Sequence, residues 1–180
     1  MDDWKDFYPD AAEANSRGEM EPLWGSVTVQ VYVDANHAGN LANRRSHSGV
    51  PLYVGNSLIN LYSKRQNTFE SSSFGSEFVA LRISTDMVEA RRYKFRTFDV
   101  NLEGPEEVYY YNNSVVKNSI VPYSVFNKRH NAICYHIVIE YQADGTLRVG
   151  WIPGEYNLAD LFTKTKMTGN MRHGMVELMF

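Results

Sequence analysis

Cysteine is nearly absent from this 180-residue sequence, in which Cys134 stands alone. A single cysteine excludes a disulfide within the chain and a zinc site built from several thiolates. Long apolar runs are also missing, since no stretch approaches the roughly 20 residues of a transmembrane helix,. The N-terminus is acidic and lacks the basic and apolar regions of a secretory signal,. We therefore expect a soluble intracellular protein, in the cytoplasm or the nucleus, with no membrane partner.

The sequence has no excess of basic charge. It carries 18 Lys and Arg against 21 Asp and Glu, for a net charge of -3. Any binding of nucleic acid must therefore depend on a local basic patch. The length suits one domain with short tails. We expect a linker or tail over residues 1–25, a domain over 26–166, and a C-terminal tail or frayed helix over 167–180.

The order of the predicted elements indicates an α/β fold. Val27, Val29, Val31 and Val33 alternate at the period of a strand, which ends at Asp34,. A turn at 55–56 joins two further strands, so the first three strands form an antiparallel meander. The remaining pattern predicts strands over 49–54, 57–63, 108–111 and 146–152, and helices over 74–98, about 113–119, 131–143 and 156–164. Strands that then alternate with helices favour a mixed sheet flanked by helices.

Three acidic residues lie where such a fold could bring them together. Asp34 ends the first strand, Glu77 lies in the first turns of the long helix, and Asp160 lies in the late helical segment. Carboxylate oxygens are the ligands that Mg²⁺ prefers, and two such ions about 3.5–4 Å apart support cleavage of a phosphodiester. Taken singly, each residue has an ordinary alternative as a turn former, a helix-dipole partner or a surface charge.

Local motifs in a fixed order favour the functional interpretation. These motifs are Trp4–Ala11, Tyr32–Asn40, Arg44–Gly49, Tyr62–Thr68, Glu70–Phe78, Lys128–His136 and Asn157–Lys164, and they span nearly the whole chain. Together they resemble the ribonuclease H domain of copia-type retrotransposon Pol polyproteins.

The resemblance implies a ribonuclease H-like fold, with a five-stranded mixed sheet flanked by helices. It also implies cleavage of the RNA strand of RNA–DNA hybrids with two Mg²⁺ ions, beside a reverse transcriptase domain of the same polyprotein. By position, Asp34, Glu77 and Asp160 match three of the family's four catalytic metal carboxylates. The fourth position holds Tyr111, or Asn112 if the alignment shifts by one residue.

Neither residue at this fourth position is an anion at neutral pH, since a tyrosine hydroxyl titrates at about 10. With one carboxylate lost, we expect weakened binding of at least one ion. Cleavage by this copy is therefore predicted to be strongly reduced or absent. The alternative is a catalytically inactive module that still binds nucleic acid, or a decayed retrotransposon remnant without a role.

Short basic clusters and polar side chains beside these motifs are the predicted substrate contacts. Basic side chains would contact backbone phosphates independently of sequence, and hydroxyl or amide groups would contact phosphates or 2′-hydroxyls. Ordinary surface charge is the alternative for each cluster. The predicted contacts are Arg44, Arg45, Lys64, Arg65, Ser72, Asn112, Asn113, Lys128 and His130.

Overall fold

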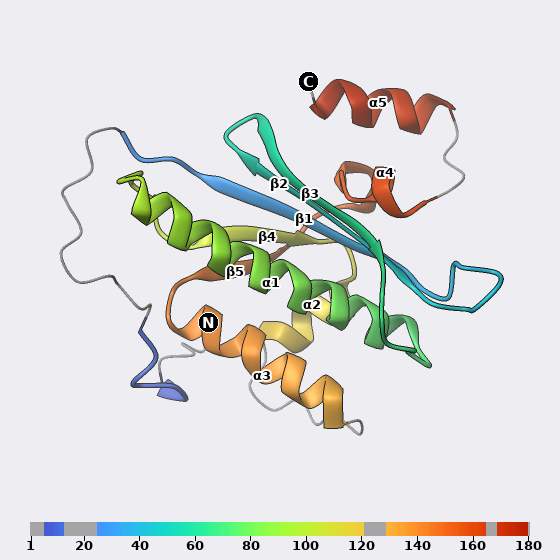
Figure 1. Ribbon diagram of the computed structural model, residues 1–180, viewed down its shortest axis with the longest axis horizontal. Helices are drawn as coiled ribbons and strands as arrows, with labels where there is room; N and C mark the ends of the chain where they lie inside the picture. The colour runs from blue at the N-terminus through green and yellow to red at the C-terminus, as the bar shows by residue number, and fades with distance from the viewer. Residues whose placement is uncertain (1–5, 13–24, 121–128, 165–168, 180) are drawn as a thin grey trace.

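A five-stranded sheet runs through the protein in the computed structural model, which describes residues 6–12, 25–120, 129–164 and 169–179 (Figure 1). The strands lie side by side in the order β3-β2-β1-β4-β5. Their bounds are β1 Val29–Asn36, β2 His47–Val54, β3 Ser57–Arg65, β4 Glu106–Tyr110 and β5 Leu147–Trp151. The predicted mixed sheet is therefore confirmed.

The first three strands pair antiparallel, as the predicted meander requires. β1 then pairs parallel with β4, and β4 pairs parallel with β5. In the β1–β4 pair, Val33 lies opposite Tyr110. The carboxyl ends of β1 and β4 therefore meet at the same edge of the sheet.

Three helices cover one face of the sheet: α1 Ser73–Thr97, α2 Asn113–Ile120 and α3 Arg129–Ala143 (Figure 1). The main core lies beneath them and includes the buried side chains of Val29, Val31 and Val33. Because side chains alternate along a strand, Tyr32 points to the opposite face, beside the cluster that contains Leu158,. The short helix α4 Asp160–Thr163 contacts β1 and β2.

The helix predicted over 156–164 is broken into two pieces. A 3-10 helix, η2, covers Gly154–Tyr156, and α4 begins only at Asp160. Between them, the backbone of Asn157 is extended, with φ −78° and ψ 97°. The Asn157 side chain bonds to backbone groups of Val33 and Ala159, which favours this break over a continuous helix,.

The structure also describes residues 6–12, near the N-terminus, and residues 169–179, near the C-terminus. Near the N-terminus, Tyr8 packs against the core, and its hydroxyl lies 3.1 Å from Nδ1 of His136. Near the C-terminus, α5 spans Gly169–Met179, so this part of the predicted tail or frayed helix is helical. None of the helices in the described ranges has the length and apolar character needed to cross a membrane.

Candidate functional site

The three predicted carboxylates lie at the edge where β1 and β4 end. Asp34 belongs to β1, Glu77 to the beginning of α1, and Asp160 to the first turn of α4. Each is almost withdrawn from solvent, with exposed fractions of 1%, 3% and 1%. Ser72 caps α1 by accepting a hydrogen bond from the backbone N–H of Gly75 at 3.2 Å, which fixes where the helix begins,.

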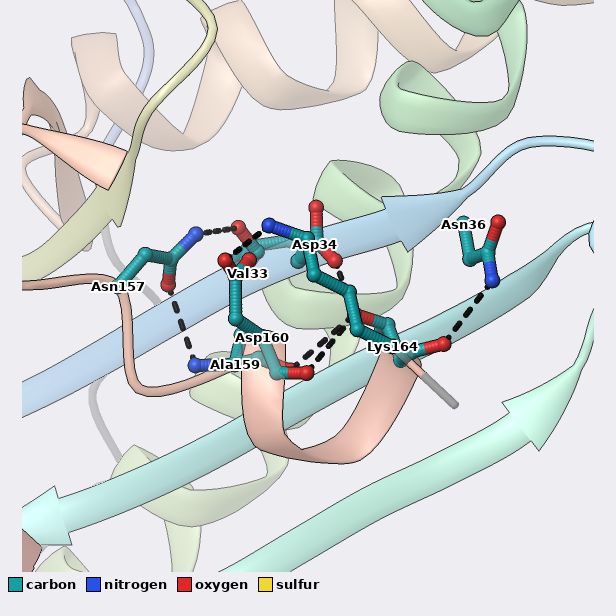
Figure 2. Close-up of polar contacts among 8 residues, drawn as sticks. Val33, Asp34, Asn36, Asn157, Ala159, Asp160 and Lys164 are labelled. Atoms are coloured by element: carbon teal, nitrogen blue, oxygen red, sulfur yellow. Dashed lines mark hydrogen bonds and ion pairs between the residues drawn. The ribbon is translucent and has the colours of Figure 1, made fainter. Parts of the chain in front are cut away.

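Hydrogen bonds hold the segment that carries Asp160 against β1 (Figure 2). Asn157 donates from Nδ2 to the carbonyl oxygen of Val33 at 3.0 Å, and Asn36 donates to the carbonyl oxygen of Thr163 at 3.0 Å. The Thr163 hydroxyl donates to Oδ2 of Asp34. These bonds join residues more than 120 positions apart and bring the last carboxylate to the first.

Tyr111 and Asn112, the two alternatives for the fourth position, both reach this site. Val33 of β1 lies opposite Tyr110 of β4 in the parallel register. The residues that follow them, Asp34 and Tyr111, therefore lie beside each other. Tyr111 lines a pocket of about 420 Å³ together with Asp34, Glu77 and Lys164. Asn112 follows, and its Nδ2 donates a hydrogen bond to Oε2 of Glu77.

Burial dominates the electrostatics of the pocket. It raises the pKa of Glu77 to about 7, and the charge of Asp34 adds to this rise, although the bond from Asn112 opposes it,. Burial also raises the pKa of Asp34 and of Asp160. The pKa of Tyr111 is raised by burial and then by Asp34, Glu77 and Asp160, so the phenol is neutral at physiological pH.

The carboxylate oxygens of Asp34, Glu77 and Asp160 do not fit a pair of divalent ions as they are arranged. Oδ1 of Asp34 and Oδ1 of Asp160 are buried without a hydrogen-bond partner, and such oxygens suit a hard cation,. However, Oδ2 of Asp160 is paired with the Lys164 ammonium, and Asn112 already donates to Glu77. Within the described ranges, no group of three His, Cys, Asp or Glu side chains could hold a metal ion.

A second pocket, of about 270 Å³, adjoins the carboxylates and is lined by basic side chains. Arg45, from the loop after β1, and Arg65, from the end of β3, lie in it with His47 and Lys164. Lys164 and Asn36 line both pockets. Two of the predicted substrate contacts, one from each basic pair, are therefore brought together next to the carboxylates.

The other predicted substrate contacts are placed differently. Arg44 and Lys64 are exposed and do not line the second pocket. Ser72 uses its hydroxyl to cap α1, and Asn113 begins α2 on the surface. Lys128 and the side chain of His130 lie outside the described residues.

Three residues of the site were not among the sequence-predicted contacts: Asn157, Thr163 and Lys164. All three lie in the last of the matching segments, Asn157–Lys164, but the sequence did not indicate a function for any of them. The spacing of four residues between Asp160 and Lys164 was a usable signal, because it allows an ion pair along one helical face,. Nothing in the spacing of Asn157 or Thr163 indicates their partners on β1.

The fold matches solved ribonucleases H. LC11-RNase H1, isolated from compost, is 19% identical and aligns over 75% of this chain and 91% of its own, with a TM-score of 0.58. RNase H1 from the halophilic archaeon Halobacterium salinarum is 16% identical and aligns over 77% of this chain and 94% of its own, with a TM-score of 0.53. The protein therefore has a ribonuclease H-like fold.

Two curated proteins are similar to this chain in sequence. They are the retrovirus-related Pol polyproteins from transposons RE2 and RE1 of Arabidopsis thaliana, 24% and 25% identical over 139 residues, or 77% of this chain. The chain thus combines a ribonuclease H-like fold with sequence similarity to retrotransposon Pol polyproteins, which confirms the resemblance found in the sequence. It spans 10% of the length of each relative. No protein-family model matches the sequence.

Proposed function

We propose that this chain is a ribonuclease H-type domain of a retrotransposon Pol polyprotein that binds RNA–DNA hybrids and cleaves their RNA strand weakly or not at all. The observation that carries the proposal is Tyr111. It directly follows β4 and lies in the pocket with Asp34 and Glu77. On the unshifted alignment, Tyr111 occupies the position to which the family resemblance assigns a metal carboxylate.

Two features of the pocket support the loss of cleavage. A neutral phenol supplies no charge to hold a divalent ion, whereas an aspartate there would add one negative charge. In addition, the Lys164 ammonium is paired with Asp160 and so competes for that carboxylate. Both features weaken the attraction for the two Mg²⁺ ions that the resemblance implies.

The second pocket supports binding of a nucleic-acid backbone. Arg45 and Arg65 offer guanidinium groups of the kind that bind phosphate, and no carboxylate side chain lines this pocket,. The Arg45 guanidinium also lies 4.7 Å from the centroid of the Phe69 ring, which restricts its orientation,. LC11-RNase H1, 18% identical over 75% of this chain, has been solved in complex with an RNA/DNA hybrid.

The relationship to Pol polyproteins supports a reverse transcriptase domain of the same polyprotein as the partner. In that arrangement, the domain would receive the hybrid made during reverse transcription. We expect this to occur inside the cell, in the cytoplasm or the nucleus.

The direct test measures binding and cleavage separately on the same chain. A fluorescent RNA–DNA hybrid is titrated with protein in EDTA and in MgCl₂, and the RNA strand is then analysed for cuts. We expect saturable binding with little or no cleavage. Rapid Mg²⁺-dependent cleavage that vanishes in Asp34→Asn would refute the predicted impairment, and an absence of binding would identify an inert remnant.

A double substitution tests whether the second pocket, which contains Arg45 and Arg65 and is called the basic pocket below, binds nucleic acid. Changing Arg45 and Arg65 to glutamine together is expected to weaken hybrid binding and to reduce the slope of log affinity against log salt by about 2, since each lost phosphate contact removes about one released counterion. The matched control changes Arg91 and Lys94 to glutamine, because these line a different pocket on α1. An equal loss of binding in the control would contradict the assignment of the basic pocket.

A further inference from the structure

We call the pocket lined by Asp34, Glu77, Tyr111 and Lys164 the carboxylate pocket. One of these residues, Lys164, brings a positively charged side chain of the protein itself into the pocket. Lys164 follows the last residue of α4, and its Nζ is ion-paired with Oδ2 of Asp160. Figure 2 shows the Lys164 side chain directed back toward Asp160 rather than out along the chain. The same Nζ lies 5.8 Å from the centroid of the ring of Tyr111, the residue to which the proposed function assigns the place of the fourth carboxylate.

The ion pair is unequal in its access to solvent. The Asp160 side chain is 1% exposed, whereas that of Lys164 is 44% exposed, so the ammonium reaches the buried carboxylate from the surface. A buried carboxylate needs a charged or hydrogen-bonding partner, because burial alone is costly. The helical spacing of four residues keeps Lys164 within reach of Asp160.

The other two carboxylates have neutral partners. Thr163 donates a hydroxyl to Asp34, and Asn112 donates an amide to Glu77. Among the described residues that line the pocket, Lys164 is the one that contributes an ammonium group. Its charge also lowers the pKa of Asp34, although burial acts more strongly in the opposite direction.

We infer that Lys164 is the resident counter-cation of this pocket and that its ammonium stabilises the folded chain in place of a divalent ion. The inference rests on the proposed function in one respect, since it takes the carboxylate pocket to be the site where related domains bind metal ions for hydrolysis. Two carboxylates and one ammonium line the pocket, and the third carboxylate, that of Asp160, is paired with this ammonium. The site therefore has too little excess negative charge to retain a pair of doubly charged ions. A divalent ion must also displace the ammonium from Asp160 before it can use Oδ2.

The test measures thermal stability and needs no nucleic acid. The wild-type chain is melted in EDTA and in millimolar MgCl₂, and we expect its melting temperature to differ by less than about 1 °C. Lys164→Gln removes the positive charge while keeping a long polar side chain. We expect this variant to melt below wild type in EDTA and to be raised by MgCl₂ by about 3 °C or more, because the ion now binds only the folded state.

Two controls separate the charge from the side chain. Lys164→Arg keeps a cation and is expected to remain insensitive to MgCl₂, whereas Lys117→Gln removes a lysine from the exposed surface of α2 and should behave like wild type. The inference is overturned if MgCl₂ raises the melting temperature of the wild-type chain strongly, or if it does not raise that of a folded Lys164→Gln variant.

If Lys164→Gln does not fold, calorimetric titration of the wild-type chain with MgCl₂ decides. Saturable Mg²⁺ binding at millimolar concentration would refute the inference. Failure of hybrid binding, in contrast, would affect only the proposed function.

Discussion

Tyr111→Asp is expected to increase cleavage of the RNA strand of an RNA–DNA hybrid by about 100-fold or more over the wild-type chain in MgCl₂, which corresponds to roughly 3 kcal/mol of the barrier. The substitution places a carboxylate beside Asp34 and Glu77. A fourth negative charge shifts the competition at Asp160 from the Lys164 ammonium toward divalent ions. Cleavage is measured on an end-labelled hybrid under single-turnover conditions.

The matched control for this prediction is Tyr111→Asn. Asparagine leaves the same space in the pocket as aspartate but adds no charge, so we expect cleavage to stay at the wild-type level. Tyr111→Asp should also lose stability in EDTA, because it adds a carboxylate to an already crowded acidic pocket. If aspartate and asparagine give equal cleavage, removal of the ring rather than the missing charge is what matters.

The sheet could be predicted from the sequence because its signals are local. Alternating valines identify β1, and a tight turn joins β2 to β3. The break at Asn157 could not be predicted, because its cause is the carbonyl oxygen of Val33, which lies 124 residues earlier in the chain. The local pattern around Asn157 favours one helix, and a tertiary hydrogen bond overrides it.

The candidate site could be predicted in part. The motifs supplied the three carboxylates and reduced the fourth position to Tyr111 or Asn112, and the parallel register of β1 with β4 shows how the two share the site. The convergence of Arg45 with Arg65 depends on the pairing of β2 with β3, whose register shifts near Leu52. Such a shift depends on contacts between strands, which short-range sequence patterns do not contain.

Asn157→Ala is expected to destabilise the folded chain by about 2–4 kcal/mol and to lower its melting temperature by about 6–12 °C. Asn157 is fully buried, and its side chain both donates to Val33 and accepts from the backbone N–H of Ala159 at 3.2 Å. Alanine leaves a buried carbonyl and a buried N–H without these partners, and it also leaves a cavity. Thermal and urea unfolding measure the loss.

The control Asn67→Ala removes the same group from an exposed loop and is expected to change stability by less than about 0.5 kcal/mol,. Hydrogen exchange then locates the effect of the Asn157 substitution. Asn157 joins residues 158–164 to β1. In the Asn157→Ala variant this segment should open more often, so its amides should exchange faster than those of the sheet core. Uniformly faster exchange across the core would mean that Asn157 supports the whole fold, rather than holding Asp160 in the carboxylate pocket.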